Sequence, residues 1–172
     1  MNRVAVVGAG AWGTALALQA ARAGCAVSLW ARDPAPLRAT RCSPHLPGHP
    51  LPDAVAVLDA LPGAGFDAVL VTVPVQHLRH VAAGLRTDAP LVLCCKGIEA
   101  GTGHLPLEIM AALHPGVPSA VLTGPPATLE RIRLAAGDLV AAGRIAALEY
   151  QPGEIFTVGN VVLATVEPKP HP

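Results

Sequence analysis

Gly8-Ala9-Gly10-Ala11-Trp12-Gly13 is the stretch of sequence that decides the fold. Before it, residues 3–7 form a short apolar, β-branched run, which is typical of a strand buried on both faces. After it, residues 14–23 contain no helix breaker until Gly24 and are rich in Ala, which predicts a helix. A second apolar run covers residues 25–30. The order strand, glycine turn, helix, strand is the context in which G-x-G-x-x-G indicates a dinucleotide site.

Each glycine of the pattern has a separate physical task. Gly8 permits a sharp turn off the strand, Gly10 lets a pyrophosphate approach the backbone, and Gly13 lets the helix pack close to the strand. The amides at the helix start, together with the positive end of the helix dipole, favour an anion. A chain with 17 glycines could carry the pattern as a purely structural turn. Its place directly between a strand and a helix favours the dinucleotide site.

The residues after the second apolar run bear on the choice of cofactor. A site selective for NAD usually carries Asp or Glu there to bind the adenosine ribose, whereas this chain has Ala31-Arg32-Asp33. The Arg32 guanidinium can stack on adenine and pair with a 2′-phosphate, while Asp33 keeps NAD open. The sequence therefore predicts NAD or NADP as cofactor. The alternative is that Arg32 is a solvated arginine at a strand end.

The composition of the chain limits which classes of molecule it is expected to bind. The chain has 172 residues, of which 14% are charged, and its 12 Lys and Arg balance its 12 Asp and Glu. This is the size of one domain, without the basic surface that nucleic acid requires. Glycines interrupt the uncharged stretch 4–21, which argues against a signal peptide or a membrane span. We expect a cytoplasmic protein with a small-molecule substrate, no nucleic acid and no membrane; a homodimer is one assembly open to it.

The cysteines and histidines do not indicate a metal. None of the four cysteines (Cys25, Cys42, Cys94 and Cys95) belongs to a C-x-x-C pair, and no carboxylate converges in sequence on the closely spaced histidines. We therefore expect no metal and no disulfide framework, and we expect Cys94 and Cys95 to be buried thiols.

The rest of the chain alternates between strand-like and helix-like segments. We predict strands at 55–57, 67–73, 91–95 and 119–123, and helices at 34–41, 76–85 and 105–113. This alternation predicts an α/β fold, a Rossmann-type doubly wound parallel sheet with helices on both faces. Four prolines within residues 43–52 predict an ordered surface loop or a flexible lid.

Lys96 stands out because the chain contains only one other lysine, Lys169. It follows a predicted strand, at the sheet edge where ligands of such folds bind. A phosphate or carbonyl ligand at that edge would give Lys96 a function. The alternative is a surface lysine that happens to follow a strand.

Six motifs in order resemble one family. They are GAGAWGTALA (8–17), LWAR (29–32), HLPG (45–48), VPVQ (73–76), KGIE (96–99) and LTGP (122–125). From Met1 to about Ala127 the chain resembles the cofactor-binding domain of the bacterial-type NAD(P)-dependent glycerol-3-phosphate dehydrogenases. The resemblance implies hydride transfer between NAD(P)H and dihydroxyacetone phosphate, with sn-glycerol 3-phosphate as the reduced partner.

The same resemblance implies roles for single residues. Ala11, Trp12 and Arg32 would line the cofactor site with the three glycines, and Ala127 would lie near the nicotinamide. Lys96 would contact both cofactor and substrate, and Gly124 would contact the substrate.

The chain also departs from the family pattern. Ala11 stands where the family usually has Ser, His45 where it usually has Tyr, and Gly124-Pro125-Pro126-Ala127 is one residue shorter than the usual Gly-Pro-Ser-Phe-Ala. We expect residues 1–127 to form the NAD(P)-binding domain and 128–172 to be a divergent tail in place of the family's helical substrate domain. In that tail, 129–148 could be a helix and 155–166 one or two strands.

No catalytic residue is identified, because the family's catalytic lysine and phosphate-gripping arginine belong to the helical domain and no motif after Thr128 corresponds to them. The sequence therefore favours a truncated, frameshifted or spliced reading frame. Three functions stay open: this dehydrogenase, a non-catalytic NAD(P)-binding module, and another phosphosugar or hydroxyacid dehydrogenase.

Overall fold

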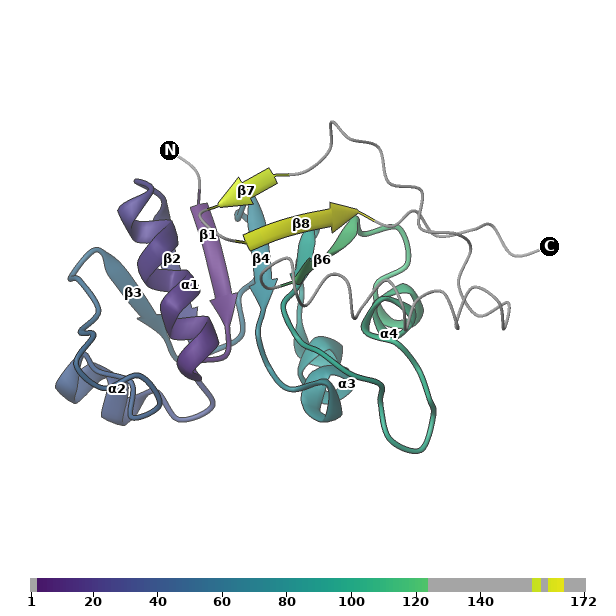
Figure 1. Cartoon of the computed structure of the whole chain (residues 1–172), viewed down its shortest axis with the longest axis horizontal. Helices are drawn as coiled ribbons and strands as arrows, with labels where there is room; N and C mark the ends of the chain where they lie inside the picture. Colours follow the sequence, from purple (N-terminus) through teal and green to yellow (C-terminus); the bar gives the residue numbers. More distant parts are fainter. Residues whose placement is uncertain (1–2, 124–155, 159–160, 166–172) are drawn as a thin grey trace. The chain divides into compact units, whose positions relative to one another are not determined.

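The structure is a computed structural model that describes residues 3–123, 156–158 and 161–165 (Figure 1). The chain divides into two compact units, Met1–Pro118 and Ser119–Pro172. The glycine turn lies in the first unit, between strand β1 (Arg3–Val7) and helix α1 (Ala11–Arg22).

The strands of the first unit form a parallel sheet in the order β3-β2-β1-β4-β5. Besides β1 they are β2 (Ala26–Trp30), β3 (Val55–Leu58), β4 (Ala68–Val71) and β5 (Leu91–Leu93). The chain moves outward from β1 to β3 and then returns to the other side of β1 at β4. This reversal confirms the predicted Rossmann-type doubly wound sheet, and it makes the carboxyl ends of β1 and β4 the place where a ligand binds in such folds.

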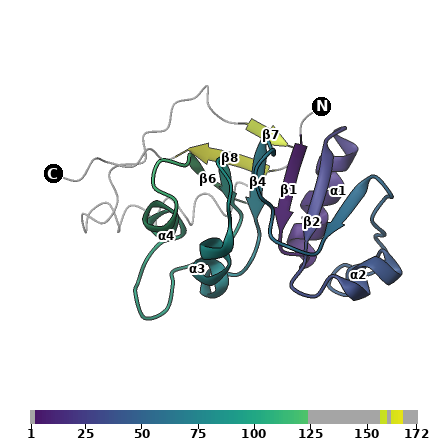
Figure 2. The same cartoon turned by 180° about the vertical axis from the view of Figure 1, so that it is seen from behind.

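The described part of the first unit also contains four helices, of which α1, α2 and α3 connect its strands and the fourth follows β5. Along with α1 they are α2 (Ala35–Thr40), α3 (Val75–Gly84) and α4 (Pro106–Leu113). Helix α1 packs on β1, β2 and β3, whereas α3 packs against α4 (Figures 1 and 2). None of the helices in the described part of the chain has the length and apolar character that crossing a membrane requires.

The core consists of the apolar strand residues and the helix residues that face them. Val6, Leu29, Val69 and Leu93 are fully buried, as the near-continuous apolar runs predict for strands of a parallel sheet. The predicted strands 67–73 and 91–95 are shorter in the structure. Their last residues stay buried as the chain leaves the sheet, so an apolar run alone overestimates the strand length.

The second unit contains three described strands, β6 (Ser119–Thr123), β7 (Phe156–Val158) and β8 (Val161–Thr165). Strand β8 pairs antiparallel with both β6 and β7. The predicted strands at 119–123 and within 155–166 are therefore confirmed. The helix predicted at 129–148 lies outside the described residues, as do Gly124 and Ala127.

Candidate functional site

The glycine turn is built by close contacts between backbone segments. Gly8 has φ +114°, a conformation that side chains other than glycine rarely adopt. A Cβ atom on Gly13 would lie 1.9 Å from the Gly8 carbonyl oxygen and 2.4 Å from Thr72 Oγ1. Both glycines are therefore required for α1 to start where it does, and the fold alone explains their presence.

Gly10 differs from the other two glycines. Its φ of −68° and ψ of 179° suit any residue, and a Cβ atom there would meet nothing within 4 Å. The fold therefore has no need of glycine at this exposed position. What the missing side chain leaves is open space directly at the start of α1.

The start of α1 has the properties of an anion site. No side chain caps the helix, and its first turn carries no acidic residue. The amides of Ala11, Trp12 and Gly13 have no carbonyl partner within the helix, because the first turn of any α-helix lacks one. These amides and the helix dipole together favour a phosphate beside Gly10.

Hydroxyl groups hold the carbonyl oxygens of the turn. Thr72 Oγ1 lies 3.0 Å from the Val7 oxygen and 2.9 Å from the Gly8 oxygen. The Ala9 oxygen accepts from Ser43 Oγ at 2.8 Å and from Thr14 Oγ1 at 3.3 Å. These contacts bind the turn to β4 and to the proline-rich loop.

The two charged residues that follow β2, Arg32 and Asp33, differ in their contacts. Arg32 is exposed, and no hydrogen-bond or ion-pair partner for its guanidinium lies among residues 3–123. Asp33 Oδ1 instead accepts from the Ala35 amide at 3.2 Å, which fixes the start of α2. The arginine is thus available to a ligand, while the aspartate already serves the backbone.

Lys96 is exposed and begins a loop that α3 holds in place. The Gln76 side chain donates to the Ile98 oxygen at 2.9 Å and accepts from the Ala100 amide at 2.8 Å. Arg79 forms two-point contacts with Glu99, the shortest of which is 2.8 Å. Lys96 therefore lies beyond the carboxyl end of β5, at the start of a loop that Gln76 and Arg79 hold by hydrogen bonds.

The Glu99 carboxylate is the centre of a charged network. It is nearly buried, with 8% of its surface exposed, and it also accepts from Thr102 Oγ1 at 2.5 Å. The Arg79 guanidinium, followed by the Thr102 hydroxyl, lowers the pKa of Glu99 to about 2. Arg79 Nη2 also lies 3.0 Å from His104 Nδ1, so Arg79 contacts the loop that follows Lys96 at both Glu99 and His104.

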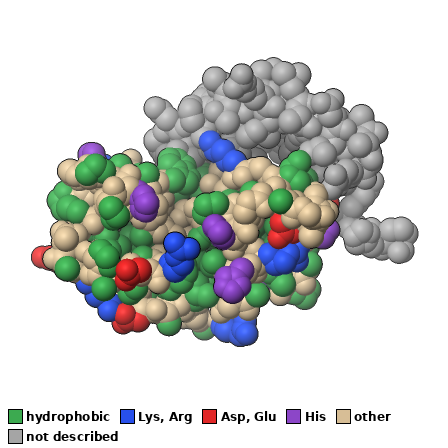
Figure 3. All heavy atoms as spheres, turned by 90° about the horizontal axis from the view of Figure 1, so that it is seen from below, with side chains coloured by type: hydrophobic (Ala, Val, Ile, Leu, Met, Phe, Trp, Pro, Cys, Tyr) green, Lys and Arg blue, Asp and Glu red, His purple; other side chains and the backbone are tan. Residues whose placement is uncertain are grey.

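Two large apolar side chains among the described residues are exposed, and both belong to segments that the sequence assigned to the site. Trp12, in the first turn of α1, is 39% exposed and Ile98, in the Lys96 loop, is 46% exposed. Figure 3 views the molecule from the side toward which β1 points, and Lys, Arg and His side chains lie among hydrophobic ones on this face.

The cysteines behave as the sequence predicts. Cys94 and Cys95 are buried free thiols, and burial raises the pKa of Cys94 to about 12. Such a thiol stays protonated and unreactive at neutral pH. Within residues 3–123, 156–158 and 161–165, no three His, Cys, Asp or Glu side chains lie together as a metal site would need.

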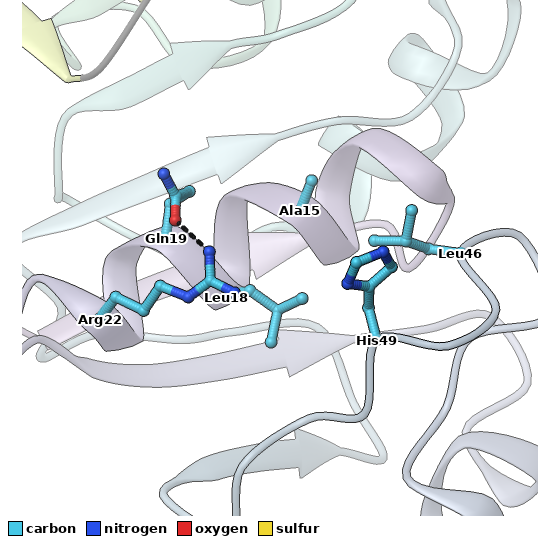
Figure 4. Close-up of a pocket in the computed structure, with 6 residues that line it drawn as sticks. All are labelled: Ala15, Leu18, Gln19, Arg22, Leu46 and His49. Carbon is cyan, nitrogen blue, oxygen red and sulfur yellow. Dashed lines mark hydrogen bonds between the residues drawn. The ribbon is translucent and has the colours of Figure 1, made fainter.

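A hollow of about 250 Å³ lies between the proline-rich loop and α1 (Figure 4). It is lined by Ala15, Leu18, Gln19, Arg22, Leu46 and His49. Leu46 and His49 come from the loop and face α1 across the hollow. The proline-rich loop thus lies beside α1 in the structure.

The family model described as the N-terminus of NAD-dependent glycerol-3-phosphate dehydrogenase matches residues 3–146. The chain belongs to this family. It is 43% identical over 156 residues to the NAD(P)+ glycerol-3-phosphate dehydrogenase of Gluconobacter oxydans, covering 84% of this chain and 48% of that relative. The enzyme of the same name from Acidiphilium cryptum is 50% identical over 125 residues, covering 70% and 38%.

A solved structure supports the same family. The crystal structure of glycerol-3-phosphate dehydrogenase from Coxiella burnetii superposes with a TM-score of 0.64 and 28% identity, over 72% of this chain and 41% of that one. This chain therefore spans about half, or less, of the length of these relatives.

The predicted site residues that the structure describes lie at the carboxyl edge of the sheet, whereas Gly124 and Ala127 lie outside the described residues. Gly8, Gly10, Ala11, Trp12 and Gly13 form the turn, and Arg32 and Lys96 follow the carboxyl ends of β2 and β5. Sequence reasoning missed the residues that fix the turn and the Lys96 loop, which are Ser43, Thr72, Gln76 and Arg79. Thr72 lies in the predicted strand 67–73 and Gln76 in the VPVQ motif, but Ser43 carries no local signal because its partner lies 34 residues away.

Replacing Glu99 with Gln is expected to destabilise the protein in a pH-dependent way. The folded state holds the pKa of Glu99 near 2, below its ordinary value of 4.5, so the stabilisation is complete above about pH 4.5 and is lost as the pH falls toward 2. Urea unfolding should show a large deficit for Glu99→Gln at pH 7 that shrinks steadily below pH 4.5.

Asp53→Asn removes one exposed carboxylate and serves as the control for net charge. A deficit for Glu99→Gln that is equal at pH 7 and pH 3 would contradict the assigned charge pairing with Arg79.

Proposed function

We propose that this chain binds NAD(P)H through the turn at residues 8–13 and the start of α1. The observation that carries the proposal is Gly10. Its backbone conformation suits any residue and a Cβ atom there would meet nothing within 4 Å, yet the residue is glycine. The turn that contains it lies within the residues that the family model matches. A pyrophosphate needs this open approach to the backbone. The family is named for its NAD-dependent activity, which agrees with the anion-binding character of the turn.

The residues present divide the work of holding the cofactor. The amides at the start of α1 would bind the pyrophosphate, and Trp12 would offer an apolar surface beside it. Arg32 would contact the adenosine end and accept a 2′-phosphate, which favours use of both NAD and NADP. Ala127 would lie at the nicotinamide end, as the resemblance implies.

The proposed reaction is reversible hydride transfer between NAD(P)H and dihydroxyacetone phosphate, forming sn-glycerol 3-phosphate. The cofactor supplies the hydride when it is bound. Lys96 would hold the substrate by its positive charge, from a loop that Gln76 and Arg79 keep fixed. Gly124 would contact the same substrate.

The proton-transfer group and the phosphate-gripping arginine are expected in a helical domain. We propose that residues 1–127 make the NAD(P)-binding domain and that 128–172 stand in place of that helical domain. A cytoplasmic location remains a prediction of the sequence, and a homodimer remains one assembly open to the chain.

A non-catalytic NAD(P)-binding module is the second candidate. It is favoured because the chain contains only two lysines, and the second, Lys169, is followed by proline instead of the asparagine of the family's catalytic pair.

Replacing Gly10 with Val is expected to abolish NADH binding without unfolding the protein. The valine side chain would enter the open space that the pyrophosphate needs, where a Cβ atom on residue 10 meets nothing within 4 Å. Titration by nicotinamide fluorescence and thermal unfolding measure the two effects.

Gly63→Val is the matched control, since a Cβ atom on this exposed glycine would meet only the Arg86 oxygen at 3.9 Å. Unchanged NADH affinity in Gly10→Val would refute the proposed site.

Replacing Arg32 with Ala is expected to weaken NADPH more than NADH. A charge-assisted contact to the 2′-phosphate contributes roughly 1.5 to 3 kcal/mol, which corresponds to about tenfold or more in Kd. Fluorescence titration with both cofactors measures the difference, and Arg22→Ala controls for the loss of one exposed positive charge. Equal losses for the two cofactors would mean that Arg32 serves adenine stacking alone.

The polypeptide by itself is expected to oxidise NAD(P)H with dihydroxyacetone phosphate at a negligible rate. A positioned general acid or base contributes about 10² to 10⁴-fold, and lost phosphate binding lowers the rate further. Supplying a matching helical domain in trans should restore part of the activity. Ketopantoate and 6-phosphogluconate are the control substrates for the alternative dehydrogenases.

Rates like those of the family that vanish in Lys96→Ala would overturn this expectation. They would mean that residues after Thr128 complete a catalytic site.

A further inference from the structure

Ser43 is a buried polar residue that reaches the glycine turn from far along the chain. Only 1% of its surface is exposed, and its Oγ donates to the Ala9 carbonyl oxygen at 2.8 Å. Thr14 Oγ1 contacts the same oxygen at the longer distance of 3.3 Å. Ser43 therefore makes the shorter side-chain contact to the peptide that enters Gly10.

The orientation of that peptide decides what a phosphate would meet. A trans peptide is planar, so its carbonyl oxygen and the amide hydrogen of the next residue point in opposite directions. Holding the Ala9 oxygen toward Ser43 turns the Gly10 amide away from the loop. It also keeps a carbonyl oxygen, which repels anions, from rotating into the phosphate position.

The segment that carries Ser43 is itself anchored. Arg41 Nη2 donates to the Pro52 oxygen at 2.6 Å and to the Val55 oxygen at 2.8 Å, which closes the loop onto the start of β3. Leu51 is buried, and Leu46 packs toward α1 (Figure 4). Ser43 is therefore a fixed support for the turn.

We propose that Ser43 is a positioning residue for the dinucleotide: it holds the Ala9–Gly10 peptide with its amide turned to the pyrophosphate. This inference rests on the proposed binding of NAD(P)H at the turn. It assigns to the proline-rich loop a part in binding the phosphates that its sequence does not suggest.

Ser43→Ala tests the proposal in the full chain. The variant removes only the hydroxyl, and the Kd for NADH and for ADP-ribose is expected to rise about fivefold, the effect of one hydrogen bond. Adenosine has no phosphate, so its Kd should stay unchanged. A merely structural role for Ser43 would weaken adenosine equally.

Thr40→Ala is the matched control. Its Oγ1 bonds only to nearby backbone, at Pro36 and Cys42, so the variant loosens the same segment without touching the turn. Its Kd for NADH should equal that of the unmodified chain. If Ser43→Ala fails to fold, Ser43→Cys keeps the shape with a much weaker donor and is expected to show the same selective loss.

A measurement without ligand separates this inference from the proposed function. In the free protein, Ser43→Ala should shift the carbonyl ¹³C resonance of Ala9 and the amide resonance of Gly10, whereas Thr40→Ala should not. Failure of the unmodified chain to bind NADH would overturn the proposed function and this inference with it. Normal NADH and ADP-ribose binding by Ser43→Ala, or an unmoved Ala9 resonance, would overturn this inference alone.

Discussion

The contact between α1 and the end of β1 is the constraint on which the rest of the site depends. A single methyl group at Gly13 would overlap the Gly8 carbonyl oxygen, since the two atoms would be 1.9 Å apart. The helix can therefore begin this close to the strand only without a side chain there. The close start aims the amides of the first turn beyond the sheet edge. The reversal of strand order between β1 and β4 leaves that edge open to a ligand.

Polar side chains give this edge its rigidity. Thr72 and Ser43 fasten the carbonyl oxygens of the turn, and Gln76 and Arg79 fasten the loop that follows Lys96. All four side chains hold backbone or a buried carboxylate, whereas Arg32 and Lys96 at the same edge stay exposed. A site prepared in this way loses less conformational entropy when a ligand binds.

Local pattern was sufficient to predict the glycine turn and the order of strands and helices in the first unit, although it placed the ends of β4 and β5 too late. The G-x-G-x-x-G spacing, the apolar runs and the helix stops each depend on residues close in sequence. The contacts that position the site do not: Ser43 and Ala9 are 34 residues apart, and Arg79 and Glu99 are 20 apart. Hydroxyl and guanidinium groups of this kind look like surface residues in a sequence, and only the fold shows what they hold. Arg41 is another case, because nothing local indicates its left-handed φ of 56°.

Gly10 has an evolutionary consequence that follows from the open space around it. Gly8 and Gly13 are held by the fold, so a descendant that no longer binds a dinucleotide must still keep them to remain folded. Under the proposed binding of NAD(P)H, Gly10 is constrained by the ligand alone. In a lineage released from selection for binding, substitutions should accumulate at this position first. Its identity among the nearest relatives of this chain is thus a record of whether binding is still maintained.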